Sequence, residues 1–414
     1  MTTEKFLGYL HEFGQEKLAA YFNGLSEEGK AAMLEQADRI DFACLEFIHA
    51  KENEKPRGLI TPIKTMKLDE IAEKKEEFRK KGLEAIKNGK VGALCLGGGM
   101  GTRLGSEHAK GMYDIGVTKP LYIYQRMFEN MLDVVKEAGA FFHIFIMTSY
   151  INHDETIEFL KEHNFFGYNP EYVSFFRQDM APCLDENGDI LLEAPDRMAM
   201  SPNGNGGFYS SLVNCGLDKK AKENGIEFIN VYAIDNVLQR IADPVFVGAV
   251  IESGRASGAK VVVKAEPKEK VGAICLEDGA PSVVEYYEMT DELLNAKNEE
   301  GEAAYNYGVI LNYLFKLDVM DKFVKAKLPF HVVKKKVPYI EFDEKEEKGY
   351  RFVKPEAPNG YKLETLTLDM VHLMGTCLPF EVVREKEFAP IKNPTGVDSV
   401  ESARKLLELN GIGL

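Results

Sequence analysis

Four short apolar runs, separated by stretches with helical periodicity, constrain the fold of this chain most strongly. The runs are rich in β-branched and aromatic residues and cover residues 91–96, 142–149, 171–178 and 226–235. Helix-like pieces such as "PLYIYQRMFENMLDVVKEAG" and "HDETIEFLKEHN" lie between them. Strands that alternate with helices indicate βαβ units. We therefore expect an α/β fold with a mixed, mostly parallel sheet.

The segment before these runs has a helical character. Residues 1–50 carry Leu, Phe and Ala at three- and four-residue spacing, and Ser26 precedes "EEGKAAMLEQADRI" as a helix cap. A charged helix is expected over about residues 69–87, before Gly89. Residues 1–88 are therefore predicted to form a helical N-terminal region.

Beyond the four runs, further apolar stretches follow one another closely. Close spacing favours antiparallel pairing, so we expect an appended mixed sheet formed by residues 258–266, 271–278, 281–289 and 304–315. From about residue 329 the chain becomes rich in lysine, and it ends in the helix-like "SVESARKLLEL". These changes predict a main domain over residues 89–330 and a smaller C-terminal domain over residues 331–414.

The charge and composition exclude several classes of partner. The chain has 414 residues and a formal net charge of −15, so a nucleic-acid backbone would be repelled and no nucleic-acid partner is expected. The six cysteines show no metal-binding spacing, which favours reduced thiols. The charged N-terminus is unlike a signal peptide and no apolar run reaches 18 residues. We expect a cytoplasmic protein with no membrane partner.

A glycine-rich loop follows the first apolar run. The stretch "LCLGGGMGTRLGSEHAKGMYD" places five glycines between Gly97 and Gly105. A loop after a parallel strand lies at the carboxyl edge of the sheet, where open α/β sheets bind ligands. Glycines there let backbone N–H groups approach phosphates closely. The loop therefore predicts a phosphate-containing ligand.

The spacing of this loop excludes two familiar phosphate-binding motifs. The dinucleotide fingerprint G-x-G-x-x-G needs a glycine where Thr102 or Leu104 stands, and a Walker A loop needs Gly-Lys followed by Ser or Thr. What remains is Arg103, which can clamp phosphate oxygens, and Lys110, which supplies a compact positive charge. The two cations suit the charge that develops when a triphosphate is attacked at its α-phosphorus.

Several spaced motifs, in one order, resemble those of the eukaryotic-type UDP-sugar pyrophosphorylases, and most closely the UDP-N-acetylglucosamine pyrophosphorylases. They cover about residues 55–407 and are "LCLGGGMGTRLG", "KGMYDIG", "PNGNGG", "VYAIDNVLQRIADPVFVG", "PSVVEYYEM", "NGYKLETLTLDM" and "FEVVREKEFAPIKN". The resemblance implies a Rossmann-like nucleotidyltransferase fold of the GT-A-like kind. It also implies formation of UDP-N-acetylglucosamine and pyrophosphate from UTP and N-acetylglucosamine 1-phosphate, with Arg103 and Lys110 as catalytic residues.

Asp235 is the candidate metal ligand. It follows the apolar run "NVYAI" and is expected to point from a strand end into the site. A carboxylate there can hold Mg²⁺ between phosphates, since Mg²⁺ usually takes one or two carboxylates besides phosphates and water. A turn or helix-cap role for Asp235 is the alternative. Mg²⁺ is the one cofactor that we expect.

The nucleotide site is expected to draw on two further segments. Gln178, Gly204 and Asn205 suit recognition of a pyrimidine edge by amide and backbone groups, although a tight turn would use the same residue types. The resemblance places Leu96 and the backbone of Gly97, Gly98 and Gly99 beside the base and ribose.

The remaining site residues rest on the resemblance alone. It implies that Glu285 binds sugar hydroxyls, that Asn306 lies near the sugar, and that Lys362 and Lys392 face the phosphates. Glu285 could otherwise be a solvated residue at a strand end, and Lys362 and Lys392 could be ordinary surface lysines.

Two positions depart from the family pattern. Ala109 stands where the family usually has proline before the active-site lysine, and Val309 replaces the second Asn of an Asn-x-Gly-Asn stretch near the sugar. A UDP-glucose or broad-specificity UDP-sugar pyrophosphorylase is therefore the first alternative. A nucleotide-sugar-binding regulator without catalysis is the second, and the joint presence of Arg103, Lys110 and Asp235 argues against it.

Overall fold

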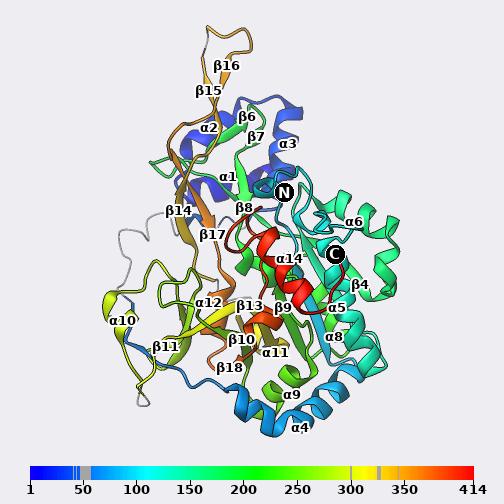
Figure 1. Ribbon diagram of the computed structural model, residues 1–414. Helices are drawn as coiled ribbons and strands as arrows, with labels where there is room; N and C mark the ends of the chain where they lie inside the picture. Colours follow the sequence, from blue (N-terminus) through cyan, green and yellow to red (C-terminus); the bar gives the residue numbers. More distant parts are fainter. Residues whose placement is uncertain (41, 43, 47–56, 299–300, 324–327, 344) are drawn as a thin grey trace. The chain divides into compact units, whose positions relative to one another are not determined.

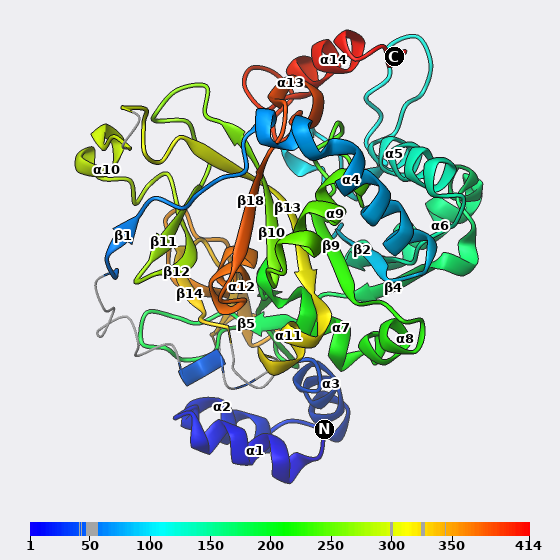
Figure 2. The ribbon, with the colours of Figure 1, turned by 90° about the horizontal axis from the view of Figure 1, so that it is seen from below.

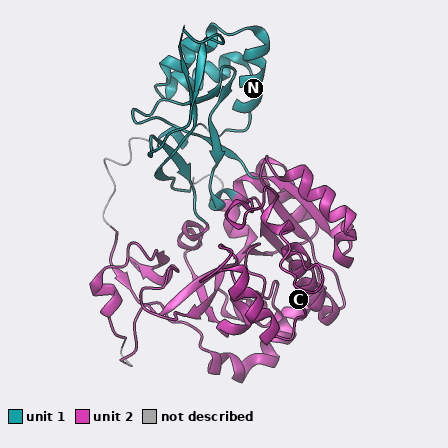
Figure 3. Cartoon of the chain, turned by 45° about the horizontal axis from the view of Figure 1, so that its top comes forward, with its two compact units in different colours: residues 1–56, 178–207, 328–366 teal, residues 57–177, 208–327, 367–414 magenta. Residues whose placement is uncertain are grey.

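The structure is a computed structural model that describes residues 1–40, 42, 44–46, 57–298, 301–323, 328–343 and 345–414. The chain forms two compact units, each built from three separate segments (Figure 3). Unit 1 comprises Met1–Pro56, Gln178–Gly207 and Leu328–Leu366, and unit 2 comprises Arg57–Arg177, Phe208–Lys327 and Thr367–Leu414.

A ten-stranded sheet forms the centre of unit 2 (Figure 1). One half of it is parallel, with strands in the order β9 (Phe228–Ala233), β2 (Val91–Leu96), β3 (Ile144–Thr148) and β4 (Val173–Arg177). Every residue of β2 and β3 is buried, as expected for parallel strands covered on both faces. The four apolar runs thus form the predicted parallel strands.

The other half of the sheet is mainly antiparallel. Strand β13 (Tyr307–Lys316) pairs antiparallel with β9 and joins the two halves. The remaining strands are β1 (Ile60–Thr61), β10 (Ser257–Val263), β11 (Ala273–Glu277), β12 (Ala280–Val284) and β18 (Cys377–Glu381). The antiparallel pairing predicted here is confirmed, but the strands continue the central sheet instead of forming an appended one. Parallel pairing returns where β18 pairs with β10.

Helices cover this sheet. Helices α4 (Leu68–Lys87) and α9 (Pro244–Ser253) pack side by side, and α9 also contacts β10 (Figure 2). The predicted helices between the parallel strands are α5 (Ile123–Ala138) and α6 (His153–Glu162). The other helices of unit 2 are α7 (Phe208–Asn214), α8 (Leu217–Glu223), α10 (Asp291–Asn295), α11 (Leu317–Phe323), α12 (Thr367–Leu373), α13 (Arg384–Glu387) and α14 (Val400–Leu409).

In its described residues, unit 1 combines three α-helices with short two-stranded sheets. Its helices are α1 (Thr3–Glu12), α2 (Glu16–Asn23) and α3 (Glu27–Ala37). The Ser26 side chain caps α3 by accepting the Gly29 N–H, as predicted. The strand pairs are β5 (Met180–Pro182) with β8 (Met200–Pro202), β6 (Leu192–Ala194) with β7 (Arg197–Met198), β14 (His331–Lys335) with β17 (Gly360–Glu364), and β15 (Tyr339–Phe342) with β16 (Tyr350–Val353).

The compact units divide the chain differently from the three consecutive segments predicted. Helix α4, expected in the N-terminal region, packs on α9 in unit 2. Residues 178–207, expected in the main domain, share a core with α1–α3 through Leu184 and Met198. Strand β18, expected in the C-terminal domain, completes the central sheet. Local periodicity predicts such elements but not which distant element buries them. None of the helices in the described part of the chain is both long and apolar enough to cross a membrane.

Candidate active site

The glycine loop leaves the sheet at the carboxyl end of β2, between β9 and β3. The Gly97 N–H donates to the carbonyl of Met147 at 2.8 Å, and the Lys110 N–H donates to the carbonyl of Gly99 at 3.0 Å. Within the described residues, the N–H groups of Gly98 and Gly99 have no hydrogen-bond acceptor. The loop therefore presents unused backbone donors beside Lys110, as a phosphate or ribose site requires.

Asn152, which is not among the predicted site residues, fixes this loop from the neighbouring strand end. The residue is fully buried. Its Nδ2 donates to the carbonyls of Gly97 at 3.2 Å and Gly99 at 3.5 Å, while its Oδ1 accepts the Ser149 N–H at 2.7 Å. The signal was available in principle, because Asn152 follows β3, and the carboxyl ends of parallel strands share one edge.

Lys110 and Asp235 meet at this edge. The Lys110 ammonium lies 3.4 Å from Oδ2 of Asp235, and the exposed fractions of the two side chains are 14% and 21%. The pair forms because β2 and β9 are parallel neighbours with Leu96 opposite Ala233. Segments that follow the two strands therefore emerge together. The structure thus brings together two of the predicted site residues that are 125 positions apart in sequence.

Arg103 lies further along the same loop. It stands in the short helical turn Thr102–Leu104, which Gly105 ends with a φ of 76°. Its side chain is exposed and has no hydrogen bond or ion pair with any other residue that the structure describes. Its guanidinium is therefore available for a ligand.

The segment that carries Lys392 is bound to the Asp235 loop. The Ile391 N–H donates to the Asp235 carbonyl at 2.9 Å. Asn236 strengthens this junction, because its Nδ2 donates to the Glu387 carbonyl at 2.7 Å and its Oδ1 accepts the Ala389 N–H at 2.9 Å. The Lys392 ammonium pairs with Asp398 at 3.0 Å. Lys392 therefore directly follows the residue whose backbone binds Asp235, the candidate metal ligand.

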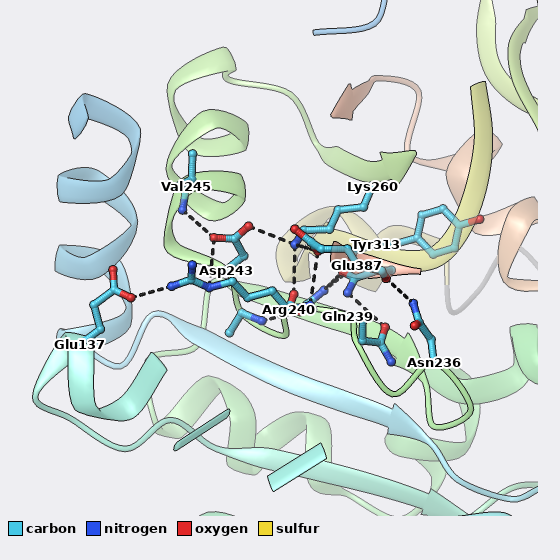
Figure 4. Close-up of polar contacts among 12 residues, drawn as sticks. Glu137, Asn236, Gln239, Arg240, Asp243, Val245, Lys260, Tyr313 and Glu387 are labelled. Atoms are coloured by element: carbon cyan, nitrogen blue, oxygen red, sulfur yellow. Dashed lines mark hydrogen bonds and ion pairs between the residues drawn. The ribbon is translucent and has the colours of Figure 1, made fainter. Parts of the chain in front are cut away.

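A buried charged cluster anchors the same segment through Glu387 (Figure 4). Lys260 is fully buried, and its ammonium binds Asp243 at 3.0 Å, Glu387 at 2.5 Å and the Arg240 carbonyl at 3.1 Å. Burial raises the pKa of Glu387 despite the nearby Lys260. Burial also disfavours the charge on Asp243, but Lys260 and Arg240 together hold the pKa of Asp243 below its usual value.

The predicted sugar-binding residues lie in the antiparallel half of the sheet. Ala273 pairs with both Val284 and Gly308, and the Val309 N–H donates to the Gly272 carbonyl at 2.9 Å. A Cβ at Gly272 would lie 3.6 Å from the Glu285 carboxylate. Glu285 and Val309 therefore flank Gly272 on one face of the sheet.

Asn306 lies immediately before β13. Its carbonyl accepts the Lys264 N–H at 2.8 Å, which ties it to the end of β10. Val309 lies three positions further along, within β13. This strand stands between β9, which leads to the Asp235 loop, and β11, which begins directly after Gly272.

Gln178, Gly204, Asn205 and Lys362 belong to unit 1, whereas the residues above belong to unit 2. Gln178 is buried, and its Nε2 donates to the Gly204 carbonyl at 2.6 Å. Gly204 has a φ of +86°, and a Cβ there would lie 2.2 Å from the Thr365 carbonyl, so this turn requires glycine. Asn205 begins the helical turn that follows.

Lys362 lies on β17, where it pairs with Val333 of β14. Within unit 1 the structure brings together Gln178 and Gly204, which are two of the three residues predicted to recognise the pyrimidine.

The family described as UTP–glucose-1-phosphate uridylyltransferase matches residues 43–408. The chain belongs to this family. It is 35% identical to the UDP-N-acetylhexosamine pyrophosphorylase-like protein 1 of Mus musculus, over 94% of this chain and 80% of the relative. It is 32% identical to the UDP-N-acetylglucosamine pyrophosphorylase of Saccharomyces cerevisiae, over 95% of this chain and 87% of the relative.

Solved structures lead to the same fold. The uridine diphosphate N-acetylglucosamine pyrophosphorylase of Trypanosoma brucei superposes with a TM-score of 0.84 at 26% identity, over 98% of this chain and 84% of that chain. A mutant UDP-glucose pyrophosphorylase of Leishmania major shares the fold with a TM-score of 0.62 at 17% identity, over 89% of this chain and 77% of that chain. The predicted family and the α/β nucleotidyltransferase fold are confirmed.

Proposed function

We propose that this chain transfers a uridylyl group from UTP to N-acetylglucosamine 1-phosphate, giving UDP-N-acetylglucosamine and pyrophosphate. The observation that carries the proposal is the Lys110–Asp235 pair beside a glycine loop with unused N–H donors. The choice of the acetylated sugar is supported by relatives named for N-acetylglucosamine or N-acetylhexosamine in Mus musculus, Arabidopsis thaliana and Saccharomyces cerevisiae.

The proposed chemistry is a direct displacement. An oxygen of the sugar 1-phosphate forms a bond to the α-phosphorus of UTP, while the bond from that phosphorus to the pyrophosphate oxygen breaks. The attacking oxygen is already an anion, so no general base is required. Lys110 stabilises the charge that develops at the α-phosphate, and the exposed guanidinium of Arg103 holds the departing pyrophosphate.

Mg²⁺ is proposed as the metal cofactor, with Asp235 as its protein ligand. No group of three or more His, Cys, Asp or Glu that could hold a metal occurs among the described residues. A single carboxylate fits Mg²⁺, which takes most of its other ligands from phosphates and water in nucleotide sites. When bound, the ion would neutralise part of the phosphate charge. Asp235, partly exposed and beside Lys110, is positioned to hold it.

The other residues bind the two substrates in this proposal. The backbone of Gly97, Gly98 and Gly99, with Leu96, flanks the uridine, and Gln178 with Gly204 and Asn205 reads the uracil edge. Glu285 and Asn306 bind the sugar, while Lys362 and Lys392 contact phosphates. Amide and backbone groups suit uracil because they can both donate and accept hydrogen bonds.

Glucose 1-phosphate is the second candidate substrate. One observation favours it, since Val309 puts an apolar side chain on the face that carries Glu285, where an amide would offer a hydrogen bond to an acetamido group. The family's description also names glucose 1-phosphate.

The test is pyrophosphate release from UTP and Mg²⁺ with either sugar phosphate. The proposal predicts a clear preference for N-acetylglucosamine 1-phosphate, read as kcat/KM. Preference for glucose 1-phosphate would support the second candidate. If neither sugar phosphate yields pyrophosphate while UTP or UDP-N-acetylglucosamine still binds, the chain is the non-catalytic nucleotide-sugar-binding regulator.

A further inference from the structure

Glu155, in the first turn of α6, contacts the two residues that precede Lys110. Its Oε1 accepts the Ala109 N–H at 2.8 Å, and its Oε2 lies 3.1 Å from Nδ1 of His108. The Glu155 side chain is only 29% exposed. One carboxylate therefore holds two consecutive residues of the loop through a backbone donor and a neighbouring ring.

Ala109 stands between two fixed points. Its own N–H is held by Glu155, and the next N–H, that of Lys110, is held by the Gly99 carbonyl at 3.0 Å. Ala109 is fully buried, with φ −53° and ψ 138°. This φ lies within the narrow range that proline imposes. The Glu155 contact therefore restrains the backbone of Ala109 through its N–H. A proline at this position would have its φ fixed by the ring and would carry no N–H for Glu155 to bind.

We propose that Glu155 is a positioning residue of the phosphate-binding loop, which sets the backbone from which Lys110 reaches Asp235 and the substrate phosphates. The role of Lys110 here rests on the proposed function. A hydrogen bond to a carboxylate is stronger than one to a neutral acceptor, and it restrains Ala109 from outside the loop. Small displacements of a charged group from its working position cost large factors in rate.

The first test measures the loop without substrate. Amide hydrogen exchange of the peptide that covers about residues 104–113 should become at least about 10-fold faster in Glu155→Ala, because the Ala109 N–H loses its acceptor. Glu155→Gln retains an acceptor oxygen and should stay within about 3-fold of the unsubstituted chain. Asp154→Ala is the matched control, because Asp154 lies in the same helix turn but pairs with Arg177. It should leave the exchange unchanged.

The second test is a double-mutant cycle on pyrophosphate release. Glu155→Ala should lower kcat by about 10- to 100-fold with less than about a 3-fold change in KM for UTP, because Lys110 acts on charge that develops in the transition state. In an Ala109→Pro background, which has no N–H to restrain, the same substitution should lower kcat by less than about 3-fold.

Two results would overturn the positioning role. One is unchanged loop exchange in Glu155→Ala, and the other is an equal loss of kcat in both backgrounds. The exchange measurement decides alone if Ala109→Pro does not fold. It also separates this inference from the proposed function, because loop exchange reports on Glu155 even if the unsubstituted chain releases no pyrophosphate.

Discussion

Two of the groups in unit 2 in which a lysine meets a carboxylate differ in every property that decides their use. The Lys110–Asp235 pair has a separation of 3.4 Å and keeps 14% and 21% of its side-chain surfaces exposed. The Lys260 ammonium is fully buried and has two carboxylates and a carbonyl within hydrogen-bond distance. The first group keeps capacity for a ligand, whereas the second is already saturated.

The difference follows from solvation. A buried charge is tolerated only when partners replace its water shell, and Lys260 has enough of them. A partly exposed, loosely held pair retains water that a phosphate can displace. Burial and partner number, not residue type, therefore separate a structural lysine from a candidate catalytic one in this fold.

The two groups are nevertheless mechanically linked. Glu387 binds Lys260 through its carboxylate and Asn236 through its carbonyl, and Asn236 follows Asp235 in sequence. The buried cluster therefore supports the segment that contacts the Asp235 loop (Figure 4).

The largest expected effect tests the saturated group. Lys260→Ala should destabilise the fold by about 3–5 kcal/mol, because it removes the ammonium that pairs with two buried carboxylates, those of Asp243 and Glu387. The measurement is urea unfolding at pH 7. Lys405→Ala, which removes an exposed lysine paired with Glu401, is the control and should cost less than about 1 kcal/mol. Equal small losses in both variants would contradict the distinction.

Arg103 tests the other half of the comparison, the partly exposed site around Lys110 and Asp235. Because its side chain is exposed and has no partner among the described residues, Arg103→Ala should leave the free energy of unfolding within about 0.5 kcal/mol. Turnover should fall by about 100-fold, the lower end of the range for a lost transition-state contact. Arg103→Lys should recover only part of this loss, since an ammonium cannot form a bidentate clamp. Full activity in Arg103→Ala would remove its proposed role.

His143 shows what burial does to a base that has no carboxylate partner among the described residues. Burial, together with the charge of Lys220, lowers the pKa of His143 to about 4. The unfolded chain then takes up the proton first, near its ordinary value of 6.5, so stability present above pH 6.5 is progressively lost toward pH 4. The part due to His143 should be on the order of 1 kcal/mol between pH 7 and 5, after allowance for solvent screening.

The measurement compares urea unfolding at pH 7 and pH 5 for the unsubstituted chain and for His143→Gln. Glutamine is chosen because its amide can still form a hydrogen bond with the Ser174 hydroxyl, which lies 2.9 Å from Nε2 of His143. The variant should lose less stability over this interval. An identical pH slope would show that His143 is not responsible.

The smallest effect concerns sugar choice. Val309→Asn adds an amide on the face that carries Glu285, so it should raise the preference for the acetylated sugar by about 2- to 5-fold, the scale of one net hydrogen bond. The ratio of the two kcat/KM values measures this. Val309→Leu keeps the position apolar and should leave the ratio unchanged. A fall in the ratio for Val309→Asn would place the acetamido group elsewhere.

The site formed by the glycine loop, Lys110 and Asp235 could be predicted from sequence to a large extent. The apolar runs of β2 and β9 are continuous, and parallel strands place the loops that follow them at one edge of the sheet. The sequence therefore predicts that Lys110 and Asp235 belong to one site. The positive groups of an acidic chain were also easy to recognise. The roles of the individual residues stay predictions.

Sequence patterns did not identify the saturated group, formed by Lys260 and its partners, or the two side chains that support the glycine loop. Lys260 and Glu387 are 127 positions apart in sequence, and neither lies in a pattern that signals a charge pair. Asn152 and Glu155 act through backbone groups of residues about 50 positions earlier. The division into compact units was also missed, because periodicity describes single elements while burial is decided between distant ones.

The most direct measurement is the steady-state rate of pyrophosphate release from UTP, Mg²⁺ and N-acetylglucosamine 1-phosphate by the unsubstituted chain and by Lys110→Ala, with the free energy of unfolding determined for both. If the pair beside the glycine loop is the catalytic centre, turnover falls by about 10²- to 10³-fold while stability changes by less than about 1 kcal/mol. Turnover within about 3-fold of the unsubstituted chain would contradict it.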